Sequence, residues 1–386
     1  MNNKAIPYGK HFITEEDIME VVNVLKSNFL TQGPKVLEFE KAFAKYIGCD
    51  YAVAVSNGTA ALHLSALALG VKEKDKIITT SITFSASANC IKYCGGDVLF
   101  CDINPETYLI DILKLEEILT NSPKGTIKGI VVVDFAGSPN NLENFKKIAV
   151  KYGLWILEDA CHSPGGFFVD SNNVEQKCGN GIFADLAIFS FHPVKHIAAG
   201  EGGMITTNNY LLYKKLLNLR THGIQQDPNL KIYNDGPWYY EMQELGYNYR
   251  LTDIQAALGL SQLKRADEGL KRRIKIAEKY YNAFNKLENI IGQSGVINGH
   301  AYHLYIIEVN ERDALYEYLR SVNIISQIHY VPVHLMPYYR NFGWKEGDLP
   351  NSEQYYKRCL SLPIFPTLTD VEQDFVINTI LEFYNK

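Results

Sequence analysis

Several features that would assign this chain to a familiar class are missing from its 386 residues. Apolar runs stay short of the ~18 residues that suggest a membrane-spanning helix. The segment from Met1 to Pro7 lacks the apolar stretch of a signal peptide. The net charge of −5 leaves no excess of lysine and arginine to favour nucleic acid or an anionic membrane. We therefore expect a cytoplasmic protein that has neither nucleic acid nor a membrane as a partner.

Cysteine is sparse, and the signatures of several enzyme classes are absent. The seven cysteines form an odd, scattered set, and only Cys90 and Cys94 share a helical spacing. Without a second cysteine or histidine pair we expect no metal site, and reduced thiols fit the cytosol. The sequence has no G-x-x-x-x-G-K-[ST], H-E-x-x-H or G-x-S-x-G. Residues 179–184 match G-x-G-x-x-A but lead into a strand instead of following one, so we interpret them as a turn.

The length and the pattern of apolar residues together indicate two domains. From about residue 50, apolar strands alternate with amphipathic helical stretches, which favours an α/β fold with a mostly parallel central sheet covered by helices on both faces. A capping box at Thr252–Gln255 opens a helix predicted to run to about Leu287. Predicted strands at 302–309 and 324–330 and helices at 313–321 and 370–384 then form a smaller C-terminal α+β domain. We predict a large domain over 1–260 and a small one over 261–386.

Residues 225–250 interrupt this alternation with a polar and aromatic stretch that has no clear period. A loop this long in a compact domain is usually functional or pairs with another chain. We therefore expect it to take part in the active site or in a subunit contact.

Two residues of opposite charge each follow a predicted buried strand. Asp159 ends the apolar run that begins at Leu154, and Lys195 follows the run that ends near Phe191. These are the two groups that pyridoxal phosphate needs, because an amine forms the Schiff base and a carboxylate keeps the pyridine nitrogen protonated. A lone lysine after a strand is more often a solvated loop residue, so its surroundings decide between the two interpretations.

A candidate phosphate site lies where the strand over residues 51–55 meets an Ala- and Leu-rich helix. Gly58 lets the backbone approach an anion closely, and the free N–H groups of the helix favour a phosphate. Thr59 adds a hydroxyl, and Ser190 is a candidate for a second donor. A plain turn with a helix cap explains the same residues without a ligand.

Two ring-bearing side chains are further candidates. Phe84 follows a predicted strand and can stack on a flat ring, although a core phenylalanine fits the same pattern. His162 lies three residues after Asp159, where it can contact a cofactor or serve as a structural histidine.

Taken together, these segments resemble the DegT/StrS family of nucleotide-sugar aminotransferases, which have the fold-type-I PLP-dependent transferase architecture. The resemblance extends from about residue 6 to residue 385, and four blocks in the same order make it specific. The blocks are Ser56–Leu62, Glu158–His162, Ser190–Lys195 with Gly200–Gly203, and Gly246–Ala257.

The resemblance implies roles for individual residues. Lys195 matches the Schiff-base lysine, and Asp159 matches the partner of the pyridine nitrogen. Gly58, Thr59 and Ser190 match the phosphate ligands. Phe84 matches the stacked aromatic, and the family relationship also implies a homodimer with shared active sites. The remaining cofactor contacts would be His162 and, from the neighbouring subunit, Asn248. The implied cofactor is pyridoxal 5'-phosphate, with pyridoxamine 5'-phosphate as an intermediate.

Other segments are similar to one branch of this family, which aminates C4 of a UDP-linked 4-keto-6-deoxy-N-acetylhexosamine in pseudaminic acid (nonulosonate) biosynthesis. The similar segments are residues 6–9, 27–33, 236–240 and 329–334. This similarity implies that the keto sugar is bound by Tyr8, by Asn28, Phe29, Leu30 and Thr31, and by His329, Tyr330, Val331 and Pro332.

The expected reaction is a ping-pong transfer of an amino group from L-glutamate to the UDP-keto sugar. Arg250 is a candidate for binding the glutamate carboxylate, because a guanidinium matches it bidentately, and a structural ion pair is the alternative. Another nucleotide 4-keto sugar, of the legionaminic, bacillosamine or perosamine type, needs the same catalytic core. A pyridoxamine-dependent 3-dehydratase would carry histidine in place of Lys195, and a non-catalytic PLP-binding regulator would not need the full set of residues.

Overall fold

The computed structural model describes residues 5–225, 227–233 and 235–385, and a seven-stranded sheet lies at its centre. In this sheet β10 is antiparallel to both of its neighbours, and the other pairs are parallel. The mostly parallel sheet predicted from the alternating pattern is therefore confirmed. In spatial order the strands are β2 (Tyr51–Val55), β10 (Gly203–Thr207), β9 (Leu186–Ser190), β6 (Trp155–Asp159), β5 (Ile127–Val133), β3 (Lys76–Thr80) and β4 (Asp97–Cys101).

Helices cover both faces of the sheet because successive side chains in each strand point to opposite sides. On β2, Val53 and Val55 pack on one side, and Ala52 and Ala54 pack on the other. The first face is covered by α3 (Gly58–Ala68), α4 (Ala86–Tyr93) and α7 (Tyr210–Arg220). The second is covered by α2 (Pro34–Ile47), α5 (Ile112–Asn121), α6 (Leu142–Tyr152) and α8 (Asp253–Leu263). A further helix, α1 (Glu15–Leu25), packs on α8.

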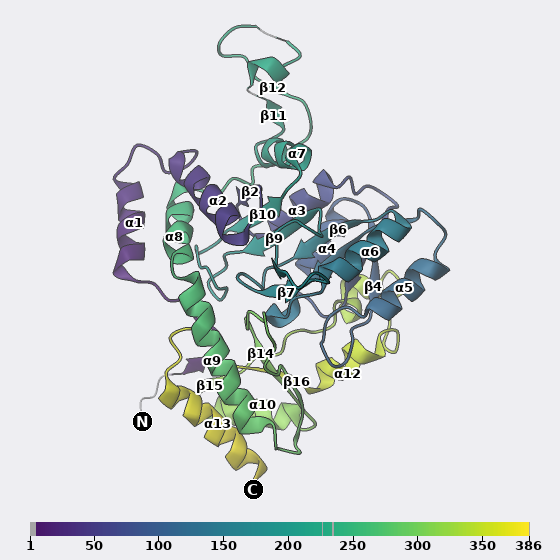
Figure 1. Ribbon diagram of the computed structural model, residues 1–386, viewed down its shortest axis with the longest axis vertical. Helices are drawn as coiled ribbons and strands as arrows, with labels where there is room; N and C mark the ends of the chain where they lie inside the picture. The colour runs from purple at the N-terminus through teal and green to yellow at the C-terminus, as the bar shows by residue number, and fades with distance from the viewer. Residues whose placement is uncertain (1–4, 226, 234, 386) are drawn as a thin grey trace.

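A second core lies in the C-terminal part of the chain, at the bottom of Figure 1. An antiparallel sheet of β13 (Ile290–Gln293), β14 (Tyr305–Val309) and β16 (Cys359–Leu362) packs with α9 (Ala266–Phe284), α10 (Arg312–Ser321) and α13 (Asp370–Tyr384). The N-terminal β1 (Ile6–Pro7) joins this part by pairing in parallel with β15 (Ile324–Ile325). The remaining elements are the hairpin β7 (Phe167–Val169) and β8 (Glu175–Lys177), with α11 (Pro337–Arg340) and α12 (Pro350–Arg358).

Two sequence-based predictions in this region were wrong in extent. The single helix expected from residue 252 to about 287 is two helices, α8 and α9. The backbone leaves helical geometry at Arg265 (φ −111°, ψ 6°), whose guanidinium pairs with the buried Asp17 of α1. The strand expected over 324–330 is only β15, because the following residues leave the ladder and lead toward a cavity. The domain boundary near residue 260 stays a prediction.

The described residues between 224 and 242 form an arm that extends from the body of the protein beyond α7 (Figure 1). Its base is the antiparallel pair β11 (Ile224–Gln225) and β12 (Glu241–Met242). Large side chains along the arm are exposed, among them Tyr233, Trp238 and Tyr240. Apolar side chains held away from the body suit a contact with another molecule.

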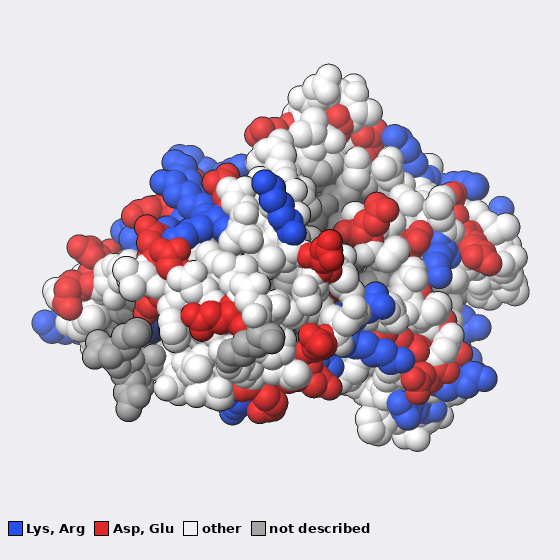
Figure 2. All heavy atoms as spheres, turned by 90° about the horizontal axis from the view of Figure 1, so that it is seen from below, with Lys and Arg blue, Asp and Glu red and all other residues white. Residues whose placement is uncertain are grey.

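Charged side chains of both signs are interspersed over the face of the molecule in Figure 2. Among the described helices, none combines the length and apolar character needed to cross a membrane.

Candidate active site

A cavity of about 600 Å³ opens where the carboxyl ends of the parallel strands meet. Because β6 and β9 are parallel neighbours, their last residues, Asp159 and Ser190, lie at the same edge of the sheet. Ligands of open α/β sheets bind in this position. Ten of the residues predicted from the sequence line the cavity: Tyr8, Gly58, Thr59, Phe84, Asp159, His162, Ser190, Lys195, His329 and Tyr330.

Lys195 lies in the turn that links β9 to β10. Its backbone N–H donates to the carbonyl of His192 at 2.8 Å, which holds the turn. Its Nζ lies 3.4 Å from Nε2 of His303. Burial lowers the pKa of the Lys195 amine, and the opposing effects of Cys161 and Asp159 are smaller. More of the amine is therefore neutral at neutral pH than for an exposed lysine.

Asp159 ends β6, and its carboxylate faces the cavity. Oδ2 accepts a hydrogen bond from the Ser87 hydroxyl at 2.6 Å, and Oδ1 accepts one from the Cys161 N–H at 3.2 Å. A carboxylate has about four acceptor positions, so roughly half remain for a group in the cavity.

Gly58 is the first residue of α3, and Asn57 caps the helix by accepting from the N–H of Ala60 at 2.8 Å. A Cβ on Gly58 would lie 3.0 Å from Cβ of Ser190 and 3.3 Å from its hydroxyl oxygen. The glycine therefore leaves room between the helix N-terminus and Ser190. Unpaired N–H groups and the helix dipole favour an anion there.

The aromatic candidates line the wall of the cavity next to Tyr330. Phe84 is 60% exposed, so it is not the core residue that the sequence also allowed, and its ring centroid lies 6.3 Å from that of Tyr330. Nδ1 of His162 accepts from the Ala136 N–H at 3.2 Å, so its Nε2 carries the proton and faces the Tyr330 hydroxyl at 3.3 Å. Burial, followed by the charge of Lys195, lowers the pKa of His162 well below its usual range.

Eight predicted residues do not line this cavity in the single chain. Thr31 bridges to Thr252, Asn248 to Thr221 and Arg250 to Val55. These backbone segments therefore lie beside the start of α8, the end of α7 and the end of β2. None of the ion pairs among the described residues includes Arg250, so the structural pair that was the alternative is not observed. The eight residues are Asn28, Phe29, Leu30, Thr31, Asn248, Arg250, Val331 and Pro332.

Sequence reasoning missed two residues that contact the central pair. Ser87 donates to Asp159, and His303 faces Lys195 from the C-terminal part of the chain. Ser87 lies four residues after Thr83, a spacing at which side chains meet in a helical turn, so the sequence weakly predicted a contact between the two hydroxyl groups. No local pattern in the sequence indicated His303, because it meets Lys195, 108 residues away in sequence, only in the folded protein.

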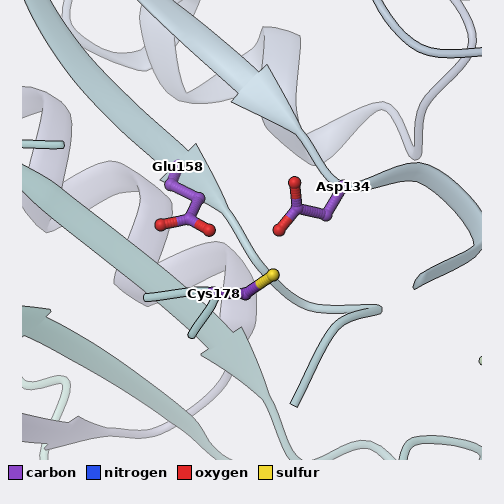
Figure 3. A group of neighbouring side chains, drawn as sticks. All are labelled: Asp134, Glu158 and Cys178. Carbon is purple, nitrogen blue, oxygen red and sulfur yellow. The ribbon is translucent and has the colours of Figure 1, made fainter. Parts of the chain in front are cut away.

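Figure 3 shows a second group of titratable side chains, Asp134, Glu158 and Cys178. Glu158 precedes Asp159 in β6, so its side chain points to the other face of the sheet from the carboxylate that lines the cavity. One atom each from Asp134, Glu158 and Cys178 lie within 4.8 Å of one another, and all three side chains are buried. Asp134 accepts from Asn140 and Ser163, and Glu158 Oε2 accepts from the N–H of Gly179. Glu158 Oε1 has no hydrogen-bond partner among the described residues. Burial, and then the charge of Asp134, raises the pKa of Glu158 well above its usual range.

The residues around the cavity fit pyridoxal phosphate. A carboxylate with free acceptor positions suits a protonated ring nitrogen, and the space beside Gly58 and Ser190 suits a phosphate. Between these two places lie the amine of Lys195 and the flat side chains of Phe84 and His162.

Comparisons with known proteins agree with this interpretation. The profile of the DegT/DnrJ/EryC1/StrS aminotransferase family matches residues 11–381. The spore coat polysaccharide biosynthesis protein SpsC of Bacillus subtilis is 39% identical over 387 residues, covering 98% of this chain and 97% of that protein.

Solved structures are similar over nearly the whole chain. PseC of Helicobacter pylori, an aminotransferase involved in the biosynthesis of pseudoaminic acid, is 29% identical with a TM-score of 0.89, covering 98% of this chain and 99% of that one. The PLP-form of Spr1654 from Streptococcus pneumoniae is 28% identical with a TM-score of 0.87, covering 97% of each chain. The chain therefore belongs to the DegT/DnrJ/EryC1/StrS aminotransferase family and is a sugar aminotransferase that depends on pyridoxal phosphate.

Proposed function

We propose that this enzyme moves the amino group of L-glutamate to C4 of a UDP-linked 4-keto-6-deoxy-N-acetylhexosamine, in the biosynthesis of pseudaminic acid or a related nonulosonate. The observation that carries the proposal is that one cavity joins Lys195 and Asp159 to Tyr8, His329 and Tyr330. Lys195 and Asp159 suit the chemistry common to the family. The other three are residues for which the family resemblance implies binding of the keto sugar. The likeness to PseC supports the same substrate class.

In this proposal Lys195 moves the proton. Its buried amine, with a lowered pKa, accepts a proton from the carbon that bears the amino group and returns it to the cofactor side. Nε2 of His303 lies 3.4 Å from the amine, and this contact orients the amine. Pyridoxal phosphate, when bound, supplies the carbonyl that carries the amino group and the ring that accepts electrons.

Other residues of the cavity hold and orient the cofactor in this proposal. Asp159 keeps the ring nitrogen protonated, because a neighbouring carboxylate stabilises a cationic nitrogen. Gly58, Thr59 and Ser190 bind the phosphate, with the N–H groups at the start of α3. Phe84 lies beside the ring, and neutral His162 donates to Tyr330, which leaves the Tyr330 hydroxyl proton available to a sugar oxygen.

We further propose a homodimer whose active sites are shared. Asn28–Thr31, Asn248 and Arg250 do not reach the cavity of their own chain, whereas a second copy can bring them to its mouth. Asn248 is exposed, as are Phe29 and Leu30. The exposed aromatic side chains of the arm suit the surface of a second copy.

The substrate is tested by incubating the purified enzyme with L-glutamate and a panel of UDP- and GDP-linked 4-keto sugars, followed by mass spectrometry of the products. We expect amination of the UDP-linked 4-keto-6-deoxy-N-acetylhexosamine, and none by Lys195→Ala. Preference for a GDP-linked sugar, or for a legionaminic- or bacillosamine-type precursor, would overturn the proposed substrate. Turnover by Lys195→Ala at the wild-type rate would overturn the role of the lysine.

A further inference from the structure

A chain of buried hydroxyl groups ends on the carboxylate of Asp159. Ser87 Oγ lies 2.6 Å from Asp159 Oδ2, and Thr83 Oγ1 lies 2.8 Å from Ser87 Oγ. The three residues are at most 5% exposed. They come from the loop after β3, the first turn of α4 and the end of β6, so the chain links three elements at one edge of the sheet.

The hydrogen bonds in this chain run in one direction. A serine hydroxyl has a single proton, and Ser87 gives it to Asp159. Ser87 can therefore only accept from Thr83, whose hydroxyl proton points along the same path. Hydrogen bonds in series polarise one another, so the Thr83 hydroxyl strengthens the bond that Ser87 donates.

This arrangement is unusual for a serine within a helix. Such a hydroxyl commonly bonds to a backbone carbonyl of the preceding turn. The Ser87 hydroxyl instead reaches a side chain 72 residues away, in a place where an unused polar group would be costly to bury. The position of the hydroxyl is therefore explained by the hydrogen bond that it donates to the Asp159 carboxylate.

We propose that Ser87 and Thr83 are positioning residues for Asp159, and that they fix its carboxylate so that the remaining acceptor positions face the ring nitrogen of the cofactor. The Cys161 N–H fixes the other oxygen from the opposite side. This inference rests on the proposed role of Asp159 and extends it to two further residues of the cavity lining, which act through the carboxylate.

Three variants separate the hydroxyl groups from the space that they fill. Ser87→Ala removes the donor, Ser87→Thr keeps it, and Thr83→Val removes only the outer hydroxyl at nearly constant volume. The first readout is the dissociation constant of pyridoxal phosphate, measured by equilibrium dialysis. The second is the pH dependence of the absorbance spectrum of the loaded enzyme without substrates. Thermal unfolding of each apoprotein checks that the fold is retained.

A hydrogen bond to a charged group contributes enough that Ser87→Ala should weaken cofactor binding about tenfold or more. The same variant should shift the pH midpoint of the spectrum, and Thr83→Val should do so to a smaller extent. Ser87→Thr should stay near wild type in both measurements. The other titratable groups around Asp159 are Lys195, Cys161, Glu158, Cys90 and Tyr330, and they are the same in every variant.

Two results would overturn the inference. One is a Ser87→Ala variant whose dissociation constant for pyridoxal phosphate and pH-dependent absorbance spectrum equal those of wild type. The other is a defect in Ser87→Thr as large as that in Ser87→Ala, since the shape of the side chain would then matter and not its hydroxyl. Failure of the proposed function is distinguishable, because a wild-type enzyme that aminates no UDP-linked keto sugar would leave both binding readouts intact.

Discussion

Replacement of Glu158 by glutamine should make the enzyme more stable as the pH rises, relative to wild type. Burial and then the charge of Asp134 raise the pKa of Glu158 well above its usual range, so we expect Glu158 to keep its proton in the folded protein at pH values where the unfolded chain has lost it. The unfolded chain releases this proton above a pKa of about 4.3. A group whose pKa is raised by folding contributes stability below its unfolded pKa, and this contribution is lost as the pH rises toward its folded pKa.

The size of the effect follows from a difference of one bound proton. The free energy of unfolding of wild type should fall relative to Glu158→Gln by about 1.4 kcal/mol per pH unit. This slope applies between the unfolded pKa and the raised pKa of the folded protein, so the difference should grow with every pH unit in that interval. The glutamine amide can donate to Asp134 and accept from the Gly179 N–H, so it reproduces the protonated acid.

Urea unfolding followed by tryptophan fluorescence at several pH values measures this difference. Glu288→Gln, at an exposed position, is the matched control and should run parallel to wild type. A difference between wild type and Glu158→Gln that does not change with pH above the unfolded pKa would refute the raised pKa of Glu158. Asp134 and Glu158 would then both be charged, or a cation would be bound between the side chains in Figure 3.

Two further predictions concern the cofactor site and the dimer. Gly203→Ala would place its Cβ 2.5 Å from the carbonyl oxygen of Asn57 and 3.0 Å from the N–H nitrogen of Gly58. We expect it to cost about 1–3 kcal/mol of stability and to weaken cofactor binding in a dialysis assay. Gly269→Ala in α9, whose Cβ would meet only Pro366 at 3.4 Å, should do neither. Co-expressed Lys195→Ala and Asn248→Ala subunits should recover about a quarter of wild-type activity if each active site combines residues of both subunits. Full activity of Asn248→Ala alone, or no recovery on mixing, would contradict the shared site.

Local patterns in the sequence predicted much of the site. Asp159 and Ser190 each end an apolar strand, and parallel strands bring their carboxyl ends to one edge, so their proximity could be predicted without coordinates. The cap at Asn57 and the glycine after it likewise lie within one turn of chain.

The remaining contacts depend on tertiary packing, which no local pattern reports. His303 meets Lys195 only because the C-terminal part packs over the sheet edge. The helix predicted through residue 265 divides there, at a residue that pairs with Asp17, far away in sequence. Asn248 and Arg250 match family positions, yet neither lines the cavity of its own chain.

The pairing of β1 with β15 has a consequence for how the protein is made. Ile6 pairs with Ile324, 318 residues later (324 − 6), and the Tyr8 carbonyl accepts from the Ile364 N–H at 2.9 Å. The large sheet can therefore form during synthesis, while the segment that carries Tyr8 waits for the end of the chain. Lys195 is translated midway, but the cavity around it closes only when nearly the whole chain has left the ribosome.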